Sequence, residues 1–176
     1  MYRQRSIKLL LIFSTFLFTS CNTTTPDRYF GLAVLNSNML VGFAEEGLYR
    51  DLESPSVKMD DKGAAVPMTR AEMIKDKIAF VDEDVEEING LKETGDTKEM
   101  IQASKALYAY VVPVYKTAYV QLAKLYDEAA PKEKIESETK AIHDKYYAGF
   151  KERNDKLIAI GKSYAAKHSI KVNWAE

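Results

Sequence analysis

Four tyrosines recur at a spacing that would bring their side chains together on one helix. Tyr108, Tyr115, Tyr119 and Tyr126 are separated by seven, four and seven residues. At about 100° per residue, they fall within about 20° of one line along a helix. This tyrosine line predicts an aromatic-lined groove for a small molecule, a glycan or a partner peptide. It is more often typical of the wet edge of a helical core, where each ring packs inward and each hydroxyl reaches water.

The two histidines of the chain could ligate a metal only with the right neighbours. Carboxylate metal centres in helical bundles use Glu-x-x-His pairs, but Lys140 and Ala165 stand three residues before His143 and His168. We therefore expect no metal site, no haem and no other cofactor. We expect His143 to be a structural histidine that hydrogen-bonds a buried tyrosine or carboxylate.

Acidic residues are dense between Asp82 and Glu87. An EF-hand loop requires glycine at its sixth position, which Glu87 occupies here, so this run predicts a solvated helix face. The chain has neither a Gly-x-Ser-x-Gly elbow nor a glycine-rich phosphate loop, the usual signatures of a serine nucleophile and of a phosphate site. We expect no catalytic residue. The alternative is a pair of carboxylates facing one cleft at roughly 5–9.5 Å, as in glycoside hydrolysis.

The single cysteine, Cys21, follows a leader with three successive parts. Arg3, Arg5 and Lys8 give a cationic start, residues 9–18 are mostly apolar, and two small residues precede the cysteine. An apolar stretch of about ten residues suits a signal peptide and is too short to span ~30 Å of hydrocarbon as a helix. The pattern predicts a signal peptide over residues 1–20.

The residues before Cys21 resemble a lipobox, the recognition site of the bacterial lipoprotein signal peptidase. The resemblance implies that the Cys21 thiol carries a diacylglycerol and that its amine, freed by cleavage, carries a third acyl chain such as palmitate. Each buried methylene contributes ~0.8 kcal/mol, so several chains would hold the protein stably on a membrane. Asn22 follows the cysteine, which by the enterobacterial sorting rule implies the outer membrane of the cell envelope.

The composition of the chain limits the kinds of protein that it can be. The 176 residues carry 25 basic and 26 acidic side chains, for a net charge of −1. This balance excludes a strongly basic nucleic-acid binder. Hydrophobic residues make up 46% and charged residues 29% of the chain, which are ordinary values for a globular domain. We expect residues 21–27 to be a polar tether and residues 28–176 to be one domain.

Hydrophobic periodicity predicts helices through most of that domain. The clearest helix covers 69–90, opened by a Thr69/Glu72 capping box and followed by apolar residues at spacings of four and three. A second helix is expected from 96 to about 130, with a kink at 109–113 caused by Pro113. A bent helix can open a gap beside its neighbours. A third helix is expected over 131–168, and a less regular one over 28–52.

These elements predict an all-α fold: an antiparallel bundle of three long helices, an N-terminal helix and a short extended C-terminal tail. The plan resembles the small helical envelope lipoproteins of Bacteroidota, a group of unassigned function. We expect a non-enzymatic, membrane-anchored lipoprotein that binds a partner protein or small ligand. The tyrosine line is the first candidate surface, and a loop at 53–68 is the second. A structural spacer in an outer-membrane assembly is a further alternative.

Overall fold

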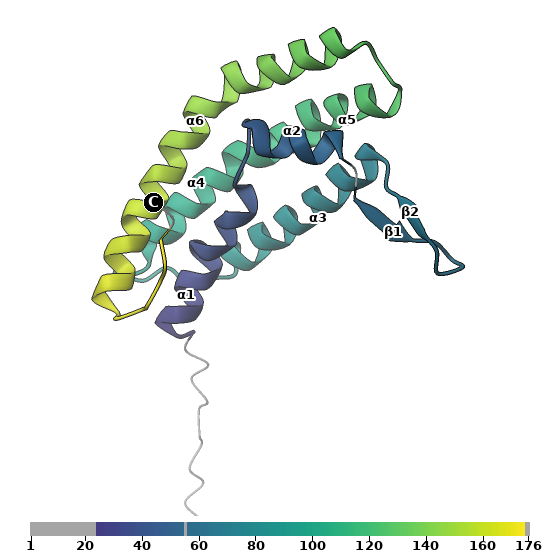
Figure 1. The fold of residues 1–176 in the computed structure, drawn as a ribbon. Coiled ribbons are helices and arrows are strands. Elements are labelled where there is room, and N and C mark those ends of the chain that lie inside the picture. The colour runs from purple at the N-terminus through teal and green to yellow at the C-terminus, as the bar shows by residue number, and fades with distance from the viewer. Residues whose placement is uncertain (1–23, 55, 175–176) are drawn as a thin grey trace, which may run out of the picture.

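The computed structural model describes residues 24–54 and 56–174 (Figure 1). The expected signal peptide and the expected lipidation site Cys21 lie outside the described residues. Helices make up most of the described chain, so the all-α prediction is confirmed. No helix in this part of the chain is both long enough and apolar enough to cross a membrane.

Helix α3 (Arg70–Asn89) begins where the capping box predicts. The Thr69 hydroxyl accepts a hydrogen bond from the Glu72 backbone N–H at 3.1 Å, and the Glu72 carboxylate accepts one from the Thr69 N–H at 2.9 Å. The reciprocal pair satisfies two of the free N–H groups at the helix start. The predicted apolar stripe faces the core, with Ile74, Val81 and Ile88 buried.

The second long segment consists of three successive pieces. Helix α4 (Lys98–Val114) leads into η2 (Tyr115–Tyr119), a π-helical turn, and then into α5 (Val120–Asp127). The irregularity is the π-helical turn that follows Pro113, one turn beyond the predicted kink at 109–113. Proline has no N–H to donate, and the Pro113 carbonyl accepts a hydrogen bond from the Thr117 hydroxyl at 2.7 Å. The helix therefore changes from α-helical to π-helical winding after the proline.

The third long segment is α6 (Lys132–Lys167), which starts directly after Pro131. The α4–α5 segment packs against α3 along one side and against α6 along the other. Figure 1 shows these long helices side by side, with α1 and α2 lying across them. The core lies between the N-terminal helices α1 and α2 and the long helices α3 to α6.

The N-terminal part, for which the sequence suggests one helix over 28–52, is divided into three pieces. They are α1 (Pro26–Ala33), the 3₁₀ helix η1 (Leu35–Leu40) and α2 (Glu46–Glu53). Gly42 and Ala44 between η1 and α2 have φ angles of 83° and 56°. A helix cannot continue through residues with positive φ, so the chain turns here.

A small hairpin replaces the predicted loop at 53–68. Strand β1 (Val57–Met59) pairs antiparallel with β2 (Ala65–Pro67), with Lys58 opposite Val66. The turn is held by the Asp60 carboxylate, which accepts hydrogen bonds from two backbone N–H groups, and by Gly63 at φ 77°. The hairpin projects away from the helices at one end of α3 (Figure 1).

After α6 the chain runs without helix to Trp174 and returns to α1. The Trp174 ring meets the Phe30 ring edge-on, with centroids 5.9 Å apart. Nearby, α1 approaches α6 so closely that a Cβ added at Gly161 would lie 2.9 Å from a Val34 methyl group. The Trp174–Phe30 contact joins the tail to α1, and the absence of a side chain at Gly161 allows the end of α1 to pack closely on α6.

Candidate ligand-binding cleft

Three members of the tyrosine line lie in the core of the bundle. Tyr108, Tyr115 and Tyr119 are 1%, 1% and 0% exposed, whereas Tyr126 is half-buried. The rings of Tyr115 and Tyr119 pack on each other with centroids 4.9 Å apart, and both contact Phe43. The tyrosine line is therefore a buried seam along α4 and η2, and it becomes half-buried only at Tyr126 in α5. It forms neither an open groove nor a wet edge over most of its length.

Specific hydrogen bonds satisfy the hydroxyls of Tyr119 and Tyr108. The Tyr119 hydroxyl accepts from the Ala44 backbone N–H at 2.7 Å, which stabilises the positive φ of that residue. The Tyr108 hydroxyl donates to the Asp84 carboxylate at 3.0 Å. Burial raises the pKa of both tyrosines well above the ordinary value, so both remain protonated at physiological pH.

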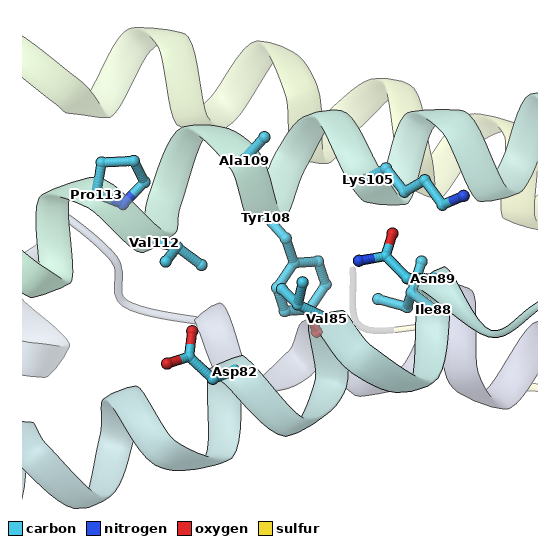
Figure 2. Close-up of a pocket in the computed structure, with 9 residues that line it drawn as sticks. All are labelled: Asp82, Val85, Ile88, Asn89, Lys105, Tyr108, Ala109, Val112 and Pro113. Carbon is cyan, nitrogen blue, oxygen red and sulfur yellow. The ribbon is translucent and has the colours of Figure 1, made fainter.

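Tyr108 also lines a cleft between α3 and α4, with a volume of about 340 Å³ (Figure 2). Its walls run along both helices, and most of the lining side chains are apolar. The lining residues are Asp82, Val85, Ile88, Asn89, Lys105, Tyr108, Ala109, Val112 and Pro113. Such a mixture of many apolar groups with a few polar ones is typical of small-molecule sites.

A buried acid fixes the tyrosine at the base of the cleft. Asp84 is only 7% exposed, and its carboxylate accepts one hydrogen bond from Tyr108 and one, at 2.8 Å, from the Asn36 amide. Burial raises the pKa of Asp84, and these two hydrogen bonds oppose the rise. Because α3, η1 and α4 meet in this network, the Tyr108 ring is held in position before any ligand arrives.

Charged side chains lie at the two ends of the cleft. At one end the Asp82 carboxylate accepts a hydrogen bond from Lys116 at 2.7 Å. At the other end Lys105 lies 3.3 Å from the Glu93 carboxylate, on the wall opposite Asn89 (Figure 2). These groups can orient a ligand whose body contacts the apolar walls.

A second hollow, of about 850 Å³, lies between the start of α2 and one face of α6. His143 borders it, with Nδ1 at 2.7 Å from the Ala44 carbonyl oxygen and its ring stacked on Tyr147. A carbonyl only accepts, so Nδ1 carries the proton. The structural hydrogen bond expected of His143 is present, with a backbone carbonyl as its partner in place of a tyrosine or carboxylate.

The acids of this second hollow are partly neutralised by lysines. Asp144 pairs with Lys140, and Glu136 lies 3.3 Å from Lys132. In the described ranges, no group of three or more His, Cys, Asp or Glu residues is placed to hold a metal ion. At the far end of the bundle His168 donates to Asp96 at 2.6 Å, so this histidine also takes part in a structural contact.

The second predicted surface, residues 53–68, presents apolar side chains to solvent. Val57 and Met59 of β1 are 65% and 67% exposed. Both lie on the same face of the strand because side chains alternate, and the residues opposite them are Pro67 and Ala65. One face of the hairpin is therefore apolar and uncovered in the isolated chain.

Sequence reasoning did not identify the cleft walls as a site. Val85 and Ile88 belong to the predicted apolar stripe of α3 and were expected to be core residues. The available signal was Pro113, because a disturbed helix can stand away from its neighbour. Pro113 lines the cleft.

Comparisons of the chain with protein-family models, with curated proteins and with solved structures give no match.

Proposed function

We propose that this protein is a lipid-anchored, non-enzymatic lipoprotein of the bacterial cell envelope that binds a small, largely apolar ligand between α3 and α4. The observation that supports this most directly is the cleft of about 340 Å³ with its apolar walls. Ligand sites are commonly ~300–1,000 Å³ and combine apolar walls with a few oriented polar groups. The Asp84–Tyr108 hydrogen bond supports the proposal because a pre-formed site loses little free energy to ordering.

The anchor is proposed from the lipobox-like residues before Cys21. Mass spectrometry of the protein purified from its native host tests it directly. We expect a chain that begins at Cys21 and carries acyl chains. A Cys21→Ser variant should lose this mass and leave the membrane fraction. A wild-type chain with an intact leader and a bare thiol would contradict the anchor.

Ligand binding can be tested on residues 22–176 with N-phenyl-1-naphthylamine, an uncharged dye whose fluorescence rises in apolar surroundings. Ala109 lines the cleft and is exposed, so Ala109→Trp fills the cleft without disturbing the core. The matched control is Ala159→Trp, at an exposed position of α6. We expect the wild type and the control to bind the dye and Ala109→Trp to bind it at least about tenfold more weakly. Equal binding by all three would place the dye elsewhere, and no binding by the wild type would contradict the proposal.

A partner protein is the second candidate, and the uncovered face of the hairpin favours it. Monomeric proteins rarely expose clustered apolar side chains without an interaction site. Replacing both Val57 and Met59 with serine should abolish cross-linking to an envelope protein without lowering the melting temperature, because both side chains are exposed. An unchanged cross-linking pattern would exclude the hairpin as the contact.

A further inference from the structure

The two ends of the α3–α4 cleft differ in the hydrogen-bonding groups that they offer. Asn89 and Lys105 lie together at one end, while Asp82 and Pro113 lie at the other (Figure 2). The antiparallel course of α3 and α4 causes this arrangement, since Asn89 at the end of α3 faces the middle of α4 and Asp82 faces the end of α4. A ligand with one polar end would therefore bind in a single direction.

The Asn89 and Lys105 end suits a negatively charged group. Lys105 contributes a positive charge, and the neighbouring Asn89 amide can donate a hydrogen bond. The present partner of Lys105 is Glu93, at 3.3 Å and with both side chains about one-third exposed. Exposed ion pairs of this kind contribute only ~0–1 kcal/mol. The lysine can therefore turn to a ligand carboxylate at little cost, while Glu93 keeps its hydrogen bond from Gln102.

The opposite end disfavours a negatively charged group. Asp82 is the acid among the nine lining residues, and its charge is neutralised by Lys116. A second anion placed here would compete with Asp82 for the same lysine and would lie against Val112 and Pro113. Apolar atoms fit these walls better, because burying a charge there would cost free energy.

The dimensions of the cleft match a short unbranched chain. The lining residues of α3 extend from Asp82 to Asn89, which corresponds to roughly 10 Å at 1.5 Å per residue. An apolar cavity of roughly 150 Å³ accepts benzene. A volume of about 340 Å³ therefore encloses roughly a dozen carbon atoms, and a larger or longer molecule would extend out of the open cleft.

We infer that the ligand is a single-chain carboxylate amphiphile of medium length, with its carboxylate at Lys105 and Asn89 and its alkyl chain extending along Val85 and Val112 towards Pro113. This inference rests on the proposed binding function and adds the class and the direction of the ligand. Charge complementarity sets the direction, since the cationic group and the Asn89 amide are at one end and the acid is at the other.

The test displaces N-phenyl-1-naphthylamine from the wild-type domain with three ten-carbon compounds: decanoate, decanol and decyltrimethylammonium. All three have the same chain and differ in the charge of the head group. We expect decanoate to displace the dye at a concentration about tenfold lower than the cation, because a charge-assisted hydrogen bond is available only to the carboxylate.

Two variants identify the group responsible. Lys105→Glu should abolish the preference for decanoate over the cation, with each displacement measured relative to the affinity of that variant for the dye. Lys98→Glu, at an exposed position of α4 outside the cleft, should leave the preference unchanged. Melting temperatures show whether each variant is folded. If the dye binds in the cleft but the three compounds displace it equally, the carboxylate inference is overturned and the binding function stands. If the dye does not bind the wild type, the binding function itself fails.

Discussion

At the scale of single residues, Asp84 differs most from what its neighbourhood in the sequence indicates. It belongs to an acidic run that predicts a solvated helix face, yet it is buried against Tyr108 and Asn36. Its partners lie 24 and 48 residues away in the chain. No local pattern encodes such contacts, so neither this network nor the burial of the tyrosine line could be predicted from spacing alone.

Removing the Tyr108 hydroxyl should therefore destabilise the protein. In Tyr108→Phe the buried Asp84 carboxylate loses one of its two hydrogen bonds, and the free energy of unfolding should fall by about 1–3 kcal/mol. Urea denaturation measures this. The control is Tyr29→Phe, whose hydroxyl donates to the Lys92 carbonyl at an exposed site and should cost less. Equal losses in the two variants would show that the Asp84 contact has no special weight.

At the scale of elements, local sequence signals predicted where helices begin. They did not predict the features that depend on contacts between distant parts of the chain. The capping box placed the start of α3, because a cap depends on residues three positions apart. Pro131 similarly marked the start of α6. The π-helical turn, the division of 28–52 and the hairpin depend on contacts with other parts of the chain. The Ala44 conformation, for example, is held by Tyr119 and His143 from two other elements.

A further long-range contact joins the end of α5 to the start of α3. The Asp127 carboxylate accepts hydrogen bonds from the Arg70 and Ala71 backbone N–H groups, at 2.8 and 2.9 Å. Asp127→Ala should lower the free energy of unfolding by about 1 kcal/mol, as for other helix caps. The control, Glu128→Ala, removes an exposed ion pair with Lys124 and should have little effect. A loss in the control as large as that in Asp127→Ala would argue against capping.

At the scale of the whole molecule, ion pairs join the α3–α4 connection to the end of α6. Near the C-terminal end of α6, Asp96 of the α3–α4 connection contacts both Lys167 and His168. Lys167 first, and then His168, hold the pKa of Asp96 below its ordinary value. The folded state therefore binds a proton at Asp96 less readily than the unfolded state does.

This difference makes a prediction about acid stability. The contribution of Asp96 is present above pH 4 and is lost as the pH falls through the lowered pKa of the folded state. Asp96→Asn should therefore be less stable than the wild type at pH 6, and the gap should narrow towards pH 2.5. Denaturation at several pH values measures the gap. A gap that stays constant with pH would show that the carboxylate charge makes no contribution.

The contact between Trp174 and Phe30 provides an optical probe at a useful place. Trp174 is the chain's single tryptophan, and it lies beneath the Lys162 ammonium group as well as against α1. Its emission wavelength will shift to the red when the tail separates from α1, even if α3 to α6 stay folded. Fluorescence and circular dichroism recorded on the same sample can therefore distinguish two events. One is the detachment of the C-terminal tail from α1, the helix nearest the proposed anchor in the sequence, and the other is global unfolding.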